Sequence, residues 1–246
     1  MKYVSIILCH YGQADDFGSE REFQRLTPGR ISILKEQGID IKSYNRSFLM
    51  KRCIDSILKN TDYPAELIVI DNGGNPDDSD YLVDLARQGK INTYVRNKNN
   101  MYFGWAWNQG AKLATGEYLL FTCNDIEFKQ NWLSKTIYPL EKYPEKKLIA
   151  APMITPDKDL RKYSRGLLED YRLNALAGSS CMLMRREVFY DIGELSNDAI
   201  AGTYWHRKMH AKGYLVVIPS DNLALHTGLI GGFNFHKRIK VAKELI

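Results

Sequence analysis

Hydrophobic and polar positions follow two different periods along this chain. Short apolar runs occur at 3–9, 67–71, 92–96, 117–122 and 148–152. Between them, apolar residues recur every three or four positions at 47–59, 79–88, 105–114 and 129–142. The first pattern is typical of buried strands and the second of helices. Their alternating order predicts βαβ units and a mainly parallel sheet.

The second half of the chain has a less regular pattern. It predicts a helix at 203–212 and strands at 181–184, 214–218 and 222–226. Trp205 and Met209 share one face of that helix, where core packing is favoured over stacking on a substrate. His206 and His210 are four residues apart, but no acid adjoins them, so we expect surface or rim positions.

Two segments depart from this rhythm. Residues 12–45 are polar and charged, contain Gly and Pro, and follow the first predicted strand. We interpret them as an inserted loop over the carboxyl end of that strand, where ligands bind in open α/β sheets. Residues 233–246 mix Phe and Ile with Lys and Arg, which indicates a basic C-terminal helix or tail packed on the domain.

Length and composition favour one globular domain covering residues 1–246. The hydrophobic fraction is 44%, and no apolar run is long enough to cross a bilayer, so we expect a cytoplasmic protein. The four cysteines are far apart and have no disulfide or zinc-site spacing. A net charge of +5 favours phosphate-bearing ligands but is too small to indicate a nucleic-acid-binding surface.

Acidic residues follow two of the predicted strands. Asp71 ends the run LIVID and is followed by Asn72 and two glycines, so its carboxylate can accept hydrogen bonds from a base or ribose, or can cap the turn. Asp125 and Glu127 follow the strand at 117–122, and an extended backbone would point both carboxylates to one side. That arrangement suits a hard divalent cation; a solvated acidic turn is the alternative.

The order of these motifs resembles the GT-A glycosyltransferases of family 2. The resemblance lies in residues 44–74, 96–128, 177–195 and 206–228. It implies an α/β/α sandwich of GT-A type with a mainly parallel nucleotide-binding sheet. It also implies transfer of a sugar from a nucleoside-diphosphate sugar, by resemblance a UDP-sugar, to an acceptor hydroxyl, with Mn²⁺ or Mg²⁺ as cofactor.

Carried over to this chain, the resemblance assigns roles to particular residues. Asp71 is implied to contact the nucleobase or ribose, and Asn108 and Gly110 to lie near the sugar-phosphate. The metal ligands would be Asp125, Glu127 and His226, although a lone His after a strand is more often structural. The candidate nucleotide-sugar residues are Cys9, His10, Tyr11, Asp71, Asn72, Asn108, Gly110 and Asn124.

Three features depart from the family pattern. The insertion splits the first nucleotide loop, and Tyr102 occupies a position where relatives usually have Gly. The acidic pair that supplies the catalytic base in inverting enzymes aligns with Ala201 and Gly202. Asp198 is the nearest carboxylate and our candidate base, with helix capping as its alternative and Asp191 and Glu194 as weaker candidates.

The missing pair leaves other functions open. A retaining transferase needs no such base, and a non-catalytic nucleotide-sugar binding protein needs none either. A nucleotidyltransferase would have a similar sheet and a similar use of a metal ion. Such enzymes usually bind a triphosphate with a basic, Gly-rich loop after the first strand, but that loop is acidic here. The acceptor stays open among a glycan, a lipid-linked sugar, a protein and, less favoured, a nucleic acid.

Overall fold

The structure is a computed structural model that describes residues 2–11, 46–153, 164–174, 180–197, 201–221 and 223–227. The expected insertion at 12–45, the tail at 233–246 and Asp198 lie outside the described residues. In the described part, no helix is long and apolar enough to cross a membrane.

A nine-stranded sheet runs through the middle of the molecule, in the order β3-β2-β1-β4-β9-β6-β10-β8-β7. Strands β1, β2, β3 and β4 are mutually parallel, and β6 and β10 run with them; β9 and β8 run in the opposite direction. The strands are β1 Val4–His10, β2 Ala65–Asp71, β3 Thr93–Arg96, β4 Tyr118–Cys123, β6 Leu148–Ala150, β7 Ser164–Leu168, β8 Tyr171–Asn174, β9 Cys181–Arg185 and β10 Leu215–Pro219.

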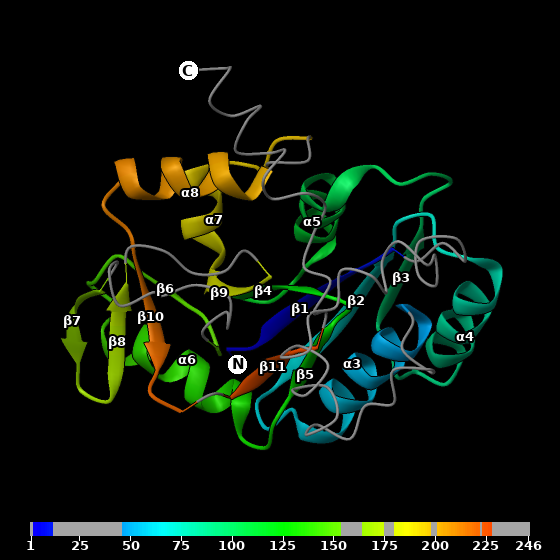
Figure 1. Cartoon of the computed structure of the whole chain (residues 1–246), viewed down its shortest axis with the longest axis horizontal. Coiled ribbons are helices and arrows are strands. Elements are labelled where there is room, and N and C mark those ends of the chain that lie inside the picture. The colour runs from blue at the N-terminus through cyan, green and yellow to red at the C-terminus, as the bar shows by residue number, and fades with distance from the viewer. Residues whose placement is uncertain are drawn as a thin grey trace, which may run out of the picture.

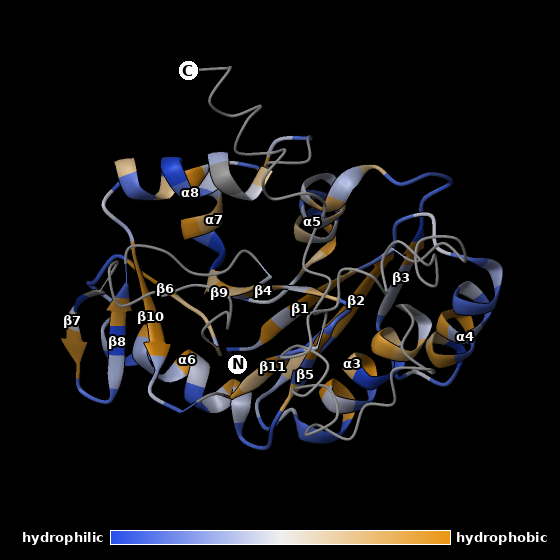
Figure 2. Ribbon diagram, viewed as in Figure 1, coloured by the Kyte–Doolittle hydropathy of each residue, from blue (hydrophilic) through white to orange (hydrophobic). Residues whose placement is uncertain are grey.

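Helices cover both faces of this sheet (Figure 1). In that view α5, α7 and α8 lie above the sheet, whereas α3, α4 and α6 lie below it. Each layer encloses its own buried apolar cluster, and the strands carry most of the hydrophobic colour in Figure 2. The helices are α3 Arg46–Asn60, α4 Pro76–Arg87, α5 Tyr102–Leu113, α6 Trp132–Lys142, α7 Arg186–Ile192 and α8 Ala201–Ala211. This arrangement confirms the α/β/α sandwich.

Several element boundaries differ from the sequence prediction for local reasons. Helix α4 begins at Pro76 rather than at residue 79, because the Asn75 side chain caps it by accepting from the backbone N–H of Asp78. Helix α6 begins at Trp132, later than the predicted residue 129. The hairpin β7–β8 and helix α7 are short elements that the periodicity of the sequence did not reveal.

A second, two-stranded sheet matters for the site; its strand within 222–226 was predicted, but its partner at 126–128 was not. Strands β5 Ile126–Phe128 and β11 Ala224–His226 pair antiparallel next to α3. Thr227 extends the contact, since its backbone N–H and its hydroxyl both donate to the carbonyl oxygen of Asp125, at 2.8 and 2.9 Å. Segments a hundred positions apart are thereby held side by side.

Helix α5 lies close to its neighbours because it has glycine at the two positions of closest approach, Gly104 and Gly110. A Cβ placed on Gly110 would lie 2.3 Å from Cγ2 of Ile7 in β1. On another face, a Cβ at Gly104 would meet the carbonyl oxygen of Ser196 at 2.4 Å. Both approaches are shorter than van der Waals contact, so α5 can hold this position only without these side chains.

We predict that Gly110→Ala destabilises the protein by about 1–3 kcal/mol through overpacking, despite a gain of up to ~1 kcal/mol in helix propensity. Urea unfolding measures the change. In a double-mutant cycle, Ile7→Ala removes the obstructing methyl group, so the pair should cost less than the sum of the single variants. Additive costs would show that the Ile7 contact does not restrict residue 110.

Candidate functional site

The carboxyl ends of three parallel strands meet at one edge of the sheet. His10 at the end of β1 pairs with Asp71 at the end of β2, and Cys9 pairs with Cys123 at the end of β4. Because these strands are parallel, the loops that follow them leave from the same edge. This edge is therefore the candidate functional site.

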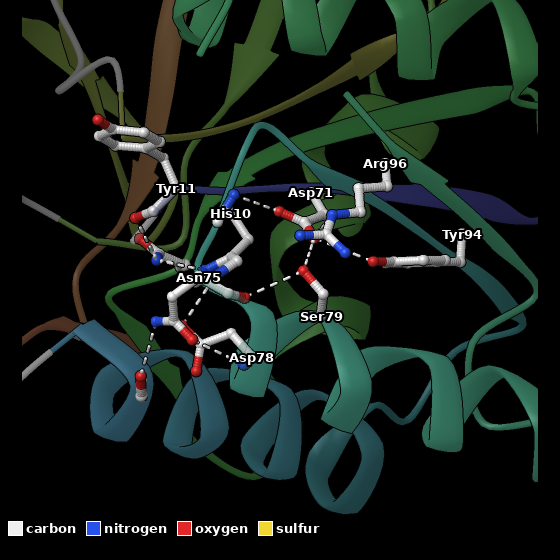
Figure 3. Close-up of polar contacts among 11 residues, drawn as sticks. His10, Tyr11, Asp71, Asn75, Asp78, Ser79, Tyr94 and Arg96 are labelled. Atoms are coloured by element: carbon white, nitrogen blue, oxygen red, sulfur yellow. Dashed lines mark hydrogen bonds and ion pairs between the residues drawn. The ribbon is translucent and has the colours of Figure 1, made fainter. Parts of the chain in front are cut away.

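Asp71 is fully buried at this edge, and its carboxylate is surrounded by donors (Figure 3). Oδ1 accepts from the backbone N–H of Gly74 at 2.7 Å. Oδ2 accepts from the hydroxyls of Ser79 and Tyr94, at 2.5 and 2.9 Å. The Nε atom of Arg96 lies 3.7 Å from the same oxygen. Burial, and then the charge of Asp71, raise the pKa of Tyr94 to about 12, so the phenol keeps its proton and donates.

These bonds bear on the two roles considered for Asp71. The bond from Gly74 is a turn cap, as the structural alternative requires. A nucleobase would have to displace Tyr94 or Arg96 to reach the carboxylate, so direct contact between Asp71 and the nucleotide stays a prediction. Ser79, Tyr94 and Arg96 were not singled out from the sequence, because nothing in their local pattern points to a partner many residues away.

The glycines after Asp71 are required by close packing. A Cβ on Gly74 would lie 2.8 Å from Oδ1 of Asp71 and 2.9 Å from Nε2 of His10. Gly73 has a φ of +84°, which L side chains rarely adopt, and a Cβ there would meet the backbone of Asn99 at 2.8 Å. The Asp-Asn-Gly-Gly sequence is thus what allows three loops to meet here.

Asn72 joins the loop after β2 to the loop after β3. Its amide nitrogen donates to Oδ1 of Asn100, at 3.0 Å, and its oxygen accepts from the Asn97 amide and the Met101 backbone, at 3.1 and 3.2 Å. This second loop delivers Tyr102, whose φ of +63° explains why a glycine suits the position in relatives. The Tyr102 side chain is half exposed on the rim of the edge.

His10 is completely buried between two elements of the edge. Its Nδ1 lies 2.9 Å from the amide nitrogen of Asn124, which can only donate, so Nδ1 accepts and Nε2 carries the proton. Nε2 lies 3.1 Å from Oδ2 of Asp78 (Figure 3). Burial acts to raise the pKa of Asp78, but hydrogen bonds from His10, Ser47 and Asn75 outweigh it and hold that pKa below its usual range.

Asp125 and His226 come together at the metal motif expected from the sequence. Nε2 of His226 lies 3.3 Å from Oδ2 of Asp125, and both side chains are mostly buried. Asp125 occupies the turn between β4 and β5, and the pairing of β5 with β11 brings in His226. A carboxylate oxygen and an imidazole nitrogen at this separation fit as two ligands of one Mn²⁺-like ion.

Glu127 has a different neighbour. Its carboxylate accepts from the guanidinium of Arg52 on α3, with Nε at 3.2 Å and a closer contact from Nη2. A continuous strand through both acids was expected, but Asp125 lies in a turn and the strand begins only at Ile126. Within the described residues, no group of three or more His, Cys, Asp or Glu side chains is arranged to hold a metal ion.

Asn108 and Gly110 position α5. The Asn108 amide donates to the carbonyl oxygen of Leu195 at 2.8 Å and accepts from its backbone N–H at 3.0 Å, so it fixes the loop after α7. Gly110 packs on Ile7, as described above. Cys9 is buried, which raises the pKa of its thiol to about 12, and Tyr11 contributes a carbonyl oxygen 3.4 Å from Nδ2 of Asn124. The proposed contacts of these four residues with the sugar nucleotide stay predictions.

The start of α8 carries Ala201 and Gly202, and both are buried. The two weaker candidates for the base have other partners. Asp191 pairs with Lys212 at 3.0 Å, near the amino end of β10 and so at the opposite edge of the sheet. Glu194 pairs with Lys112 at 3.0 Å. The first candidate, Asp198, lies outside the described residues.

Two expectations for α8 have different outcomes. Trp205 is 1% exposed and lies in the core, which confirms the packing role. The expected surface position of His206 is wrong, because that residue is only 7% exposed and its Nδ1 contacts the Gly202 carbonyl. The helix turns this ring inward beside Trp205, whose ring plane it meets edge-on.

The sheet and its two helical layers define an α/β/α domain of the GT-A type. A family model described as "Glycosyl transferase family 2" matches residues 39–193, and the chain belongs to this family. Over 132 residues it is 30% identical to "Putative polypeptide N-acetylgalactosaminyltransferase 13" of Drosophila melanogaster, covering 49% of this chain and 23% of that protein. An uncharacterized glycosyltransferase of Nostoc sp. is 28% identical over 97 residues, 39% of this chain and 30% of the relative.

Solved structures agree with the fold. A crystal structure of GalNAc-T7 with UDP, GalNAc and Mn²⁺ superposes with a TM-score of 0.61 at 14% identity, covering 89% of this chain and 42% of that one. S. aureus TarS gives a TM-score of 0.60 at 14% identity, covering 91% of this chain and 36% of that one. The chain therefore spans less than a third of the two curated relatives and less than half of the solved chains.

The low pKa of Asp78 leads to a prediction about acid stability. Its contribution is present above the unfolded-state pKa of about 3.9 and is lost as the pH falls through the lower folded-state pKa. Asp78→Asn should lower the free energy of unfolding at pH 7 by about 1–2 kcal/mol and flatten its decline below pH 4. Urea unfolding across this pH range measures both effects.

Asp84→Asn is the matched control on the same helix, because Asp84 is exposed and pairs only with Arg87 on the surface. It should change neither the stability nor its pH dependence measurably. If both variants behave alike, the contact of Asp78 with His10 does not stabilise the edge.

Proposed function

We propose that this chain transfers a glycosyl group from a nucleoside-diphosphate sugar to an acceptor hydroxyl, and that a divalent metal ion takes part. The observation that carries the proposal is the Asp125–His226 pair at the carboxyl edge of the sheet. UDP as the nucleotide and Mn²⁺ as the ion are supported by GalNAc-T7, whose structure contains both. Membership of glycosyl transferase family 2 supports the reaction class.

In this proposal Asp125 and His226 would hold the ion beside the diphosphate of the donor. The bound ion would supply Lewis-acid stabilisation of the charge that develops on the departing diphosphate. Glu127 pairs with Arg52, and it would ligate the ion only if its carboxylate were shared between Arg52 and the metal. The Asn72-centred loop contacts frame the space for the nucleotide at the same edge.

The acceptor proton needs a base if the reaction inverts the anomeric configuration. We propose Asp198 for that role, three positions before the start of α8. The base would accept the proton from the acceptor hydroxyl as its oxygen attacks the anomeric carbon and the bond to the diphosphate breaks.

A non-catalytic nucleotide-sugar binding protein is the second candidate function. One observation favours it: Ala201 and Gly202 provide no carboxylate where the family pattern has its acidic pair. Release of UDP from a UDP-sugar, with or without an acceptor, separates the two functions because a binding protein leaves the donor intact.

The ion site predicts metal-dependent nucleotide binding. Asp125→Ala should weaken UDP binding in the presence of Mn²⁺ by at least about 100-fold, or about 3 kcal/mol, because the diphosphate loses its counter-charge. His226→Ala should act in the same direction. Isothermal titration calorimetry with and without Mn²⁺ measures the effect.

Two further variants complete the design. Asp55→Asn changes an exposed acid on α3 and should bind UDP like the wild type. Glu127→Gln tests whether Glu127 ligates the ion directly. If it does, this variant should lose as much metal-dependent UDP affinity as Asp125→Ala. Unchanged metal-dependent affinity in a folded Asp125→Ala variant would contradict the proposed ion site.

A further inference from the structure

A cavity of about 350 Å³ lies between helix α5 and the loop that follows α7. Trp105, Asn108, Gln109 and Lys112 line it from the helix, and residues 194–197 line it from the loop. The helical residues are spaced three and four apart and so share one face of α5. The volume falls within the range of small-molecule sites. Asn108 and Glu194 were considered above as a sugar-phosphate contact and a weaker candidate base, whereas Trp105, Gln109 and Ser196 have been given no ligand-binding role.

The walls of the cavity are fixed by contacts across it. The Asn108 amide holds the backbone of Leu195 through two hydrogen bonds, at 2.8 and 3.0 Å. Lys112 and Glu194 form an ion pair at 3.0 Å between the same two walls. Since these two charges compensate each other, the cavity offers no excess charge for a phosphate or a carboxylate ligand.

Other groups in the cavity have unused binding capacity. Within the described part of the chain, the half-buried Trp105 makes no hydrogen bond, ion pair or ring contact. The hydroxyl of Ser196 is buried and has no hydrogen-bond partner there. Gln109 uses its oxygen to accept from Asn97, which leaves its amide N–H groups to donate elsewhere. A buried hydroxyl without a partner is costly, so a ligand that supplies one is stabilised.

We infer that this cavity binds an uncharged saccharide ring. A pyranose has an apolar C–H face, which packs on an indole ring, and hydroxyl groups that both donate and accept hydrogen bonds. Trp105 supplies the ring face, whereas Ser196 and Gln109 supply polar partners for the hydroxyls. An acyl chain would leave the polar wall unsatisfied, which argues against a lipid tail.

The position and charge of the cavity bear on whether this saccharide belongs to the donor or to the acceptor. Its loop wall ends at Asn197, next to Asp198 and the start of α8, where the family pattern has its catalytic acids. Since the paired charges of Lys112 and Glu194 leave no excess charge for the diphosphate of a donor, we assign the ring to the acceptor, which makes the acceptor a glycan. This assignment to the acceptor rests on the proposed function, whereas binding of the saccharide does not.

The tryptophans of this chain allow a direct test. Trp107, Trp132 and Trp205 are at most 1% exposed, so Trp105 is the one tryptophan that a quencher in solution can reach. Acrylamide quenching of the protein is measured while neutral hexose and N-acetylhexosamine oligosaccharides are titrated without nucleotide. We expect saturable protection of the fluorescence, and Trp105→Phe should remove the quenchable component.

Saturation-transfer NMR with the protecting sugar then measures the variants. Trp105→Ala should weaken binding by at least about tenfold, and Ser196→Ala by about three- to tenfold. Leu113→Ala is the matched control, because Leu113 is exposed on the same helix but does not line the cavity. It should bind the sugar like the wild type.

Absence of saturable protection with every sugar, or unchanged sugar affinity in Trp105→Ala, would overturn the inference. Calorimetry with UDP and Mn²⁺ on the same samples separates the two proposals. Nucleotide binding without sugar binding removes the saccharide site alone. Sugar binding without nucleotide binding supports the saccharide site and removes the proposed transferase function.

Discussion

The complete burial of the Asp71 carboxylate is the constraint around which this edge of the molecule is organised. A buried charge without partners would cost several kcal/mol, so its oxygens must be satisfied by the protein. The donors come from the turn after β2, from α4 and from β3, and the contacts of Gly73 and Gly74 bring further loops against it. A single buried group therefore links α4 and the turn after β2 to β3, in addition to the pairing of β2 with β3.

The candidate ion site depends on a second long-range arrangement. Asp125 follows a central strand, but His226 reaches it only because β11 pairs with β5 and Thr227 bonds to the carbonyl of Asp125. His10 and Asn124 link this site to α4 through a buried series of polar contacts that ends at Asp78. The carboxyl edge of the sheet and the proposed metal ligands thus belong to one connected network rather than to separate motifs.

The long periodic elements could be predicted from the sequence because burial imposes their pattern. Strands β1, β2 and β4 and helix α3 lie where the apolar spacing placed them. The three-residue strand β5 could not be found in this way, and neither could the contact between Glu127 and Arg52, which joins residues 75 positions apart. The sequence analysis also missed Tyr94, Ser79 and Asp78. Each contacts a residue of another element that is brought near only by the fold, so the local sequence pattern does not reveal the contact.

The proposed function depends on a metal ion that Asp125 and His226 would hold beside the diphosphate of the donor. Anomalous scattering from crystals grown with Mn²⁺ and UDP tests it most directly, because the signal locates manganese without reference to activity. We expect an anomalous peak in contact with both side chains and with the diphosphate oxygens. A peak at another place, or UDP bound at the carboxyl edge with no manganese beside Asp125, would contradict it.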